Sequence, residues 1–163
     1  MRPGLSLVFV SLTFISAAAP KPPSIEGTYR LVSRDLPDGS KQVPPAIDGL
    51  LTFTKAYRNF NIYWKDARGK VFSVSYTASY QLTPTEYREK SIFFLMDDEI
   101  SGKGVTSDLS GPSGTAPVTI NGQRIAWKMP LHGEPDIVFE GSTATATGHG
   151  DFGTFVDHWA RVP

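Results

Sequence analysis

The chain of 163 residues contains no cysteine. Disulfide bonds, a thiol nucleophile, cysteine-ligated zinc and thiol redox chemistry are therefore excluded. Small secreted domains often depend on disulfides because they bury too little apolar surface, but a chain of this length with 12% aromatic residues can form a core without them. We therefore expect a domain that is stabilised by burial of apolar side chains.

Net charge and long apolar runs are also lacking. The 16 basic side chains balance the 16 acidic ones, and no cluster of Lys and Arg offers the positive surface that binding to nucleic acid or anionic lipid requires. After residue 18, no apolar segment approaches the roughly 20 residues that a membrane-spanning helix needs. The sequence predicts no nucleic-acid partner and no membrane span.

Several catalytic motifs are missing as well. There is no G-x-S-x-G, no H-E-x-x-H and no P-loop, and the His, Asp and Glu residues have no known metal-ligand spacing. The segment Gly148–Gly153 fits G-x-G-x-x-G, but a β-type pattern follows it, whereas dinucleotide binding requires a helix there. We interpret it as a glycine-rich turn and expect no metal and no cofactor.

The N-terminus has the three parts of a secretory signal peptide. A basic start is followed by an apolar run, Leu5–Ile15, and by a small-residue exit, Ser16–Ala19. Cleavage after Ala18 satisfies the preference for small residues at the cleavage site. We expect residues 1–18 to be removed, residues 19–163 to form one domain, and the mature protein to be secreted or periplasmic.

The rest of the chain consists of short β-favouring runs separated by Gly, Pro, Asp and Asn. This spacing of turn residues is typical of an antiparallel sandwich or barrel. The expected strands lie near residues 27–34, 49–55, 58–65, 70–81, 89–96, 115–120, 123–129, 136–140, 142–148 and 153–161.

The clearest turn signal is Asn121-Gly122 between two alternating runs, which predicts a β-hairpin. A two-residue turn there would pair Ile120 with Gln123 and Val118 with Ile125. Trp127 would lie on the same, mostly apolar face.

Two other segments are expected to be irregular. Thr83–Glu86 carries helix-start signals, but a new apolar run follows almost at once, so we expect a bend between two strands. Ser101–Pro117 is rich in Gly and Ser and is predicted to be a long surface loop.

From Phe72 to Tyr80, apolar or aromatic residues alternate with Ser and Thr. In a strand this pattern makes one aromatic face and one hydroxyl face. Because each buried large apolar side chain stabilises the fold by about 1.5–3 kcal/mol, we expect the aromatic face to point inward. The outward face would then carry neither Lys nor Glu, so a hydroxyl-lined interior that binds a polar ligand stays open as the alternative.

Four short motifs together resemble the lipocalin-like domain of the calycin group. They are the opening "GTYRL" (Gly27–Leu31), "GLLTFT" (Gly49–Thr54), "YTASYQL" (Tyr76–Leu82) and the ending "WARV" (Trp159–Val162). The resemblance implies an all-β antiparallel up-and-down barrel of roughly eight or more strands, with little helix and room for one small ligand. It also implies that Tyr29 packs against Arg161 and closes one end of the barrel.

The resemblance and the strand faces together suggest a function. We expect the protein to bind a small, largely apolar or amphipathic molecule in the barrel cavity. The expected contacts are the aromatic side chains Trp64, Tyr76, Tyr80 and Trp127.

Two alternatives remain open. Some relatives of this barrel are cyclases or isomerases of small-molecule biosynthesis, and such an enzyme would act in the same cavity without metal or nucleotide cofactor. Its candidate acids and bases are His149, Asp151 and His158. The other alternative is a structural domain with a filled interior.

Overall fold

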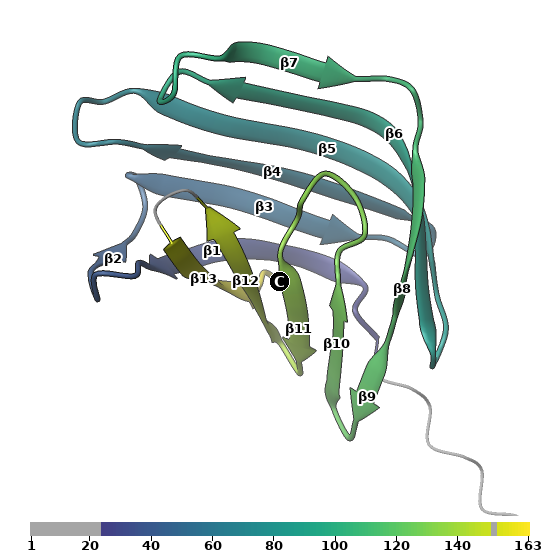
Figure 1. The fold of residues 1–163 in the computed structure, drawn as a ribbon. Coiled ribbons are helices and arrows are strands. Elements are labelled where there is room, and N and C mark those ends of the chain that lie inside the picture. Colours follow the sequence, from purple (N-terminus) through teal and green to yellow (C-terminus); the bar gives the residue numbers. More distant parts are fainter. Residues whose placement is uncertain (1–23, 151–152) are drawn as a thin grey trace, which may run out of the picture.

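The computed structural model describes residues 24–150 and 153–163 (Figure 1). Every regular element among these residues is a β-strand, and neighbouring strands pair antiparallel in a strongly curled sheet that forms a half-barrel. The expected all-β antiparallel fold with little helix is confirmed. The signal peptide predicted for residues 1–18, and Asp151, lie outside the described residues.

The described residues form 13 strands in one sheet. Their bounds are β1 Gly27–Asp35, β2 Lys41–Gln42, β3 Ile47–Phe53, β4 Tyr57–Lys65, β5 Val71–Leu82, β6 Glu86–Asp98, β7 Gly104–Asp108, β8 Ser113–Pro117, β9 Thr119–Asn121, β10 Arg124–Lys128, β11 Asp136–Glu140, β12 Thr143–Gly150 and β13 Gly153–Arg161. Each range expected from the sequence overlaps an observed strand, and the bend at Thr83–Glu86 connects β5 to β6.

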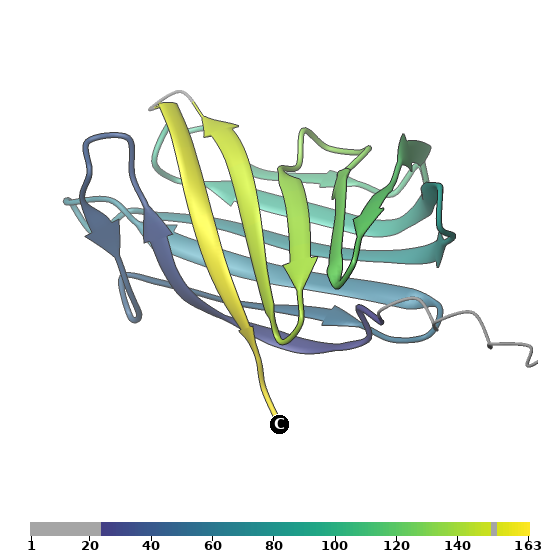
Figure 2. The same cartoon turned by 90° about the horizontal axis from the view of Figure 1, so that it is seen from below.

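The sheet folds back on itself so that two walls face each other (Figures 1 and 2). The hydrogen-bonded order is β7-β6-β5-β4-β3-β1-β13-β12-β11-β10-β9, so β1 joins the wall β3–β7 to the wall β9–β13. On the opposite side, β8 pairs with β6 and β9 pairs with β10, with only Val118 between β8 and β9. β7 is an edge of the sheet, so beside it the half-barrel is not closed by strand pairing.

The aromatic face of β5 points inward, as the alternation predicts. Tyr76, Ala78 and Tyr80 are 1%, 0% and 8% exposed, whereas the Ser and Thr residues between them are only partly buried. Rings from both walls then stack in the interior: Tyr80 on Tyr87, with centroids 5.8 Å apart, and Tyr87 on Trp127 at 4.9 Å. This end of the half-barrel is an apolar core.

The contact expected between Tyr29 and Arg161 is present. The two residues are paired across β1 and β13, and the Arg161 guanidinium carbon lies 5.3 Å from the Tyr29 ring centroid. Arg161 Nη2 also donates a hydrogen bond to Tyr29 Oη at 2.8 Å. Gly27 leaves room for this arrangement, because a Cβ atom there would lie 3.0 Å from Arg161 Nε.

The prediction of a surface loop at Ser101–Pro117 is wrong, because this segment contains β7 and β8. Both strands pair with β6: Gly104 lies opposite Asp98, and Pro117 lies opposite Glu86. The 13-residue β6 supplies a long row of hydrogen-bonding groups, so its partner needs few apolar side chains of its own. Pairing therefore overrides the low strand propensity of a Gly- and Ser-rich sequence.

The hairpin at Gly122 is present, but its predicted register is wrong. Asn121 pairs with Arg124 and Ile120 pairs with Ile125, so the turn is Gly122-Gln123. Gly122 has a φ of 61°, as required where glycine takes the first central position of a tight hairpin turn. Because the partner shifts by two residues, Ile120 and Ile125 stay on the apolar face.

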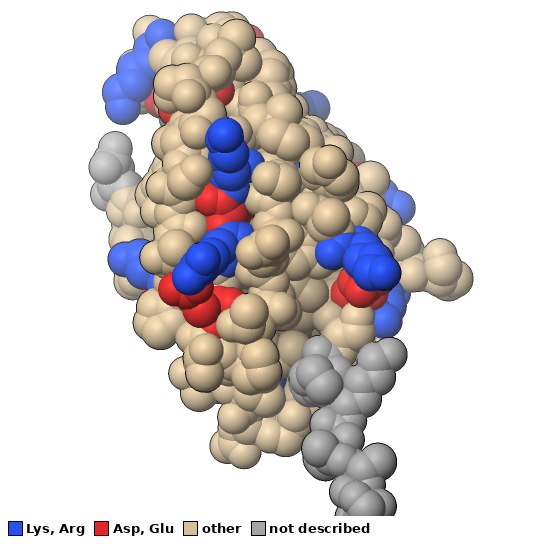
Figure 3. Space-filling view, turned by 90° about the vertical axis from the view of Figure 1, so that its right-hand side faces the viewer, with Lys and Arg blue, Asp and Glu red and all other residues tan. Residues whose placement is uncertain are grey.

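The surface carries charges of both signs. On the face shown in Figure 3, Lys and Arg side chains lie beside Asp and Glu side chains, and no large area has a single sign. None of the described segments forms a helix of the length and apolarity that crossing a bilayer requires.

Candidate functional site

A group of charged side chains is buried in the middle of the half-barrel. Arg58 on β4 and Glu89 on β6 are 1% and 3% exposed. Arg58 Nη1 donates to Glu89 Oε2 at 3.0 Å, and Arg58 Nη2 donates to Glu134 Oε1. One guanidinium therefore faces two carboxylates away from water, an arrangement that is costly unless the charges are paired.

Strand geometry explains why Arg58 and Glu89 point inward. Arg58 and Ile62 are an even number of residues apart on β4 and therefore lie on the same face of the strand, and the same holds for Glu89 and Tyr87 on β6. Ile62 and Tyr87 are both buried. Tyr87 Oη donates to Glu89 Oε2 at 2.8 Å, which holds that carboxylate against Arg58. We call Arg58, Glu89 and Glu134 the Arg58 cluster.

Glu134 belongs to the connection Met129–Pro135 between β10 and β11, which we call the β10–β11 segment. It lies between the two walls in Figure 1, and one backbone hydrogen bond, from Met129 N to Pro135 O at 3.2 Å, ties its two ends. His132 within it has a φ of 54°, a left-handed conformation that is uncommon for a residue other than glycine.

Ring contacts hold His132 in place. Its ring stacks on Phe94 with centroids 4.1 Å apart and planes at 8°, and it meets the Tyr76 ring at 5.3 Å. On its other side the segment packs against Gly114 of β8, where a Cβ atom would lie 2.8 Å from the Cβ of Pro130. The segment therefore covers the side of the half-barrel that strand pairing does not close.

Burial and charge pairing shift the pKa values in this region. Burial opposes the charge of Arg58, but Glu134, Tyr87 and Glu89 outweigh it and raise the Arg58 pKa above its usual value. Burial raises the pKa of Glu134 to about 6, although Arg58 acts in the opposite direction. Burial also lowers the pKa of His132.

The variant Glu134→Gln is expected to change how stability depends on pH. Because the folded-state pKa of about 6 lies above the ordinary 4.5, the Glu134 carboxyl contributes most to stability below pH 4.5 and loses that contribution as the pH rises through 6. This loss is roughly 2 kcal/mol in the wild type and absent from the variant. Urea unfolding at a series of pH values measures it, and parallel pH profiles for the two proteins would contradict it.

Several polar atoms in this region have no hydrogen-bonding partner among the described residues. They are Arg58 Nε, Glu89 Oε1, Glu134 Oε2, His132 Nε2, Tyr76 Oη and Ser91 Oγ, all buried. Burial raises the pKa of the Tyr76 phenol above its usual value, and the nearby Ser91 hydroxyl, which lies outside hydrogen-bonding geometry, offsets only a small part of this effect. Since folded proteins leave few buried polar groups unpaired, such a gathering marks a place where water or a bound molecule completes the hydrogen bonding.

A cavity of about 30 Å³ lies beside the Arg58 cluster. The β10–β11 segment bounds it through Met129, Glu134 and Pro135, and Phe60 and Trp159 contribute inner-face rings. Its volume is close to the ~30 Å³ that one water molecule takes up in the liquid.

The structure places three of the four predicted ligand contacts in two neighbouring groups. Tyr80 and Trp127 both stack on Tyr87, at 5.8 and 4.9 Å, and are part of the aromatic core. Tyr76 belongs to the charged region, because its ring centroid lies 4.7 Å from the Arg58 guanidinium carbon.

The fourth, Trp64, lies in a separate cluster. Its ring stacks on Phe72 at 4.2 Å and lies 4.5 Å from the guanidinium carbon of Arg34. Arg34 makes a buried two-point ion pair with Asp157, with distances of 2.6 and 2.9 Å. None of the four predicted contacts lines the 30 Å³ cavity.

The candidate acids and bases are not part of the interior site. His149 is exposed, with Nδ1 2.9 Å from Thr154 Oγ1. His158 lies between two buried residues of β13 and faces outward, with Nε2 2.8 Å from Asp35 Oδ2. Asp151 lies outside the described residues. Within residues 24–150 and 153–163, no three His, Asp or Glu side chains are placed to hold a metal ion.

The sequence analysis missed the Arg58 cluster. Two of its members could have been found, because the alternation of side chains along a strand puts Arg58 and Glu89 on the same face as apolar residues of their own strands. Glu134 has no comparable signal, since its inward position depends on how an irregular segment packs.

The chain matches no protein-family model, no curated protein and no solved structure in our comparisons. The fold by itself defines an all-β antiparallel half-barrel, which is compatible with a calycin-like architecture.

Proposed function

We propose that the protein binds a small, largely apolar molecule inside the half-barrel, beside the Arg58 cluster, and that the β10–β11 segment moves aside to admit it. The observation that supports this most directly is the gathering of unpaired buried polar atoms next to a cavity of about 30 Å³. The resemblance to lipocalin-like domains supports the same function.

The surroundings of the site indicate the chemistry of the ligand. Apart from its charged groups the cavity is lined by apolar side chains, among them Leu51, Phe60 and Trp159. If Glu134 leaves with its segment, Arg58 Nη2 loses its acceptor. A ligand with an apolar body and one acceptor group, such as a carboxylate or carbonyl, would restore that hydrogen bond.

The β10–β11 segment is a suitable moving part. Its ends are tied by a single backbone hydrogen bond, and His132 occupies a conformation that costs free energy for any residue except glycine. Segments with few backbone hydrogen bonds open at lower free-energy cost than paired strands. Displacement of this segment would widen the small cavity without breaking a strand pair.

A disulfide lock tests this proposal. The Cβ positions of residues 114 and 130 are 2.8 Å apart, somewhat closer than the 3.5–4.5 Å usual for a disulfide. The double variant Gly114→Cys, Pro130→Cys would therefore tie the segment to β8 after a small outward shift. The chain has no other cysteine, so the bond is unambiguous.

The probe is 1-anilinonaphthalene-8-sulfonate, which is apolar with one anionic group. We expect the reduced double variant to bind it as the wild type does, and the oxidised variant to bind at least about tenfold more weakly, a difference of about 1.4 kcal/mol. Circular dichroism checks that both forms are folded. Equal affinity of the oxidised and reduced forms would refute the moving segment. Native mass spectrometry then identifies any small molecule that is purified with the protein.

A second candidate is a cyclase or isomerase that acts at the same place. The specific observation in its favour is that Glu134, with a pKa raised to about 6, borders the cavity and could exchange a proton near neutral pH. Incubation of the purified protein with the molecule recovered by mass spectrometry distinguishes the two. A product of unchanged mass but altered chromatographic retention, absent with Glu134→Gln, indicates an isomerase, and an unaltered molecule indicates a carrier.

The signal-peptide pattern of residues 1–18 supports an exported location for this function. N-terminal sequencing of the protein recovered from the periplasm or culture medium tests it, with Ala19 as the expected first residue.

A further inference from the structure

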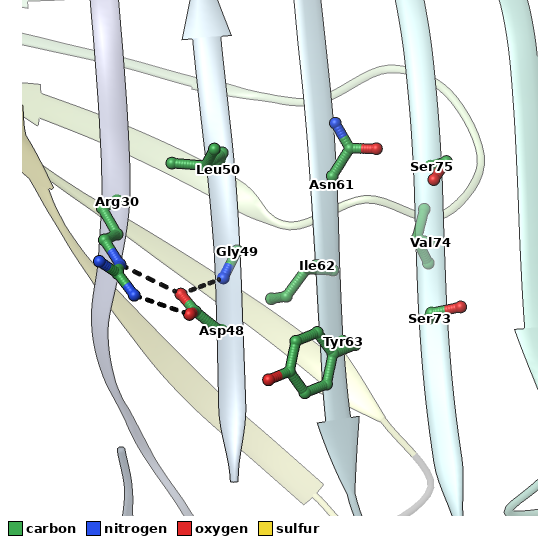
Figure 4. A pocket seen from close by; sticks show the side chains of 10 residues that line it. All are labelled: Arg30, Asp48, Gly49, Leu50, Asn61, Ile62, Tyr63, Ser73, Val74 and Ser75. Carbon is green, nitrogen blue, oxygen red and sulfur yellow. Dashed lines mark hydrogen bonds and ion pairs between the residues drawn. The ribbon is translucent and has the colours of Figure 1, made fainter. Parts of the chain in front are cut away.

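A hollow of about 460 Å³ lies on the outer face of the half-barrel and is far larger than the interior cavity (Figure 4). It extends over β1, β3, β4 and β5, with the Arg30–Asp48 ion pair at its β1 side. The hollow is shallow and open, so a ligand bound there would keep one side exposed to water. It belongs to the opposite face of the sheet from the Arg58 cluster.

Cross-strand pairing explains the hollow. Two rows of outward side chains cross the strands, one containing Leu50, Asn61 and Ser75, the other containing Asp48, Tyr63 and Ser73. In each row the side chains on β3 and β4 are larger than the serine on β5. The hydroxyl face of β5, which has no Lys or Glu, therefore leaves the outer surface recessed.

The polar groups of the hollow are held in fixed positions. Arg30 Nη2 donates to Asp48 Oδ2 at 2.9 Å, and the backbone N–H of Gly49 donates to Asp48 Oδ1 at 2.9 Å. The hydrogen bond from Arg30 keeps the pKa of Asp48 below its usual value, so the carboxylate stays an acceptor. The ion pair as a whole is neutral, and neither an anion nor a cation is favoured.

Apolar surface lies next to these groups. Leu50 is 47% exposed, and the Tyr63 ring is oriented by a hydrogen bond from its hydroxyl to Pro45 O at 3.3 Å. In Figure 4 the Tyr63 ring lies beside Asp48, with its hydroxyl directed toward β3. The hollow thus places an aromatic ring and an aliphatic side chain beside a fixed carboxylate, an amide and two hydroxyls.

We propose that this hollow binds a neutral saccharide. A sugar ring has hydroxyl groups that both donate and accept, and C–H faces that pack on an aromatic ring. Asp48 accepts, Asn61 both donates and accepts, and Tyr63 supplies the ring. Because Asp48 is already held by Arg30 and Gly49, little side-chain freedom is lost when a ligand binds.

Saturation-transfer difference NMR with named sugars tests this proposal. The neutral probes are maltose, cellobiose, lactose and N,N′-diacetylchitobiose, and the charged comparison sugars are glucuronic acid and glucosamine. At least one neutral disaccharide is expected to bind with a Kd in the millimolar range, where about −4 kcal/mol corresponds to 1 mM. The charged sugars are expected to bind more weakly.

The chain offers a matched pair of variants for this experiment. Asn61→Ala removes an amide from the hollow, whereas Asn59→Ala removes one two residues away on the same outer face, where Asn59 Oδ1 accepts from Thr77 Oγ1 at 3.1 Å. We expect Asn61→Ala to weaken binding at least about fivefold, a loss of about 1 kcal/mol. Asn59→Ala is expected to leave the affinity unchanged.

Three results would overturn the proposal: no neutral disaccharide binds, the two Asn variants bind alike, or a charged sugar binds more tightly. The outer hollow and the interior site are independent. The oxidised Gly114→Cys, Pro130→Cys variant is therefore expected to bind the disaccharide as the wild type does.

Discussion

Replacing Arg58 with methionine is expected to destabilise the protein by about 3–5 kcal/mol. The methionine side chain fills most of the space of the arginine stem, so little of this loss comes from packing. The loss arises because Glu89 and Glu134 would remain buried without their shared cation. Urea unfolding near neutral pH measures the change in the free energy of unfolding.

Two control variants distinguish the destabilisation caused by burying unpaired carboxylates from the destabilisation caused by losing one positive charge. Arg30→Met removes the cation of the Arg30–Asp48 pair, whose side chains are 58% and 26% exposed, and is expected to change the free energy of unfolding much less, because water screens an exposed ion pair. Adding Glu89→Gln and Glu134→Gln to Arg58→Met removes the unpaired charges and is expected to recover most of the stability. If Arg58→Met costs no more than Arg30→Met, the Arg58 cluster is not shielded from water as described.

Replacing Trp127 with alanine is expected to cost about 3–5 kcal/mol. Trp127 is 4% exposed and lies between two rings, with its centroid 4.9 Å from Tyr87 and 5.4 Å from Phe139. Its Nε1 also donates to the sulfur of Met129 at 3.3 Å, at the start of the β10–β11 segment. Truncation would open a large void among the stacked rings of the interior, and thermal or urea unfolding measures the resulting loss of stability.

Trp64→Ala is the comparison for this prediction. Trp64 is only partly buried and stacks on a single ring, Phe72, so a smaller loss of stability is expected. Equal losses for the two variants would mean that the core is not centred on Trp127. The comparison also decides how binding data for these two tryptophans are interpreted, since a variant that is largely unfolded says nothing about ligand contacts.

The inward and outward faces of the strands were predictable from the sequence because their period of two residues is directly visible. Tyr76 and Tyr80 point inward for this reason, and Thr77 and Ser79 between them point outward. Alternation does not show how far along its strand, or where around the half-barrel, an inward side chain lies. Trp64 and Trp127 both belong to inward faces, yet they pack in different clusters. Side chains that share a face need not share a pocket.

Features that depend on a distant partner were not predictable. β7 has a sequence typical of a loop and forms a strand because β6 lies beside it. The inward position of Glu134 results from the path of an irregular segment, and the outer hollow results from the neighbours that β3 and β4 place next to Ser73 and Ser75. In each case the decisive information is a cross-strand or segment contact between residues far apart in the chain.

The single residue between β8 and β9 affects where a ligand could enter the interior. Val118 carries the chain from one wall to the other, and its N–H donates to Thr85 O at 3.0 Å, so this junction has no slack. Across the molecule, β1 is hydrogen-bonded to both β3 and β13. Backbone pairing therefore connects the two walls at both places, whereas β7 is an edge of the sheet, and on that side the movement proposed for the β10–β11 segment would admit a ligand without disturbing either connection.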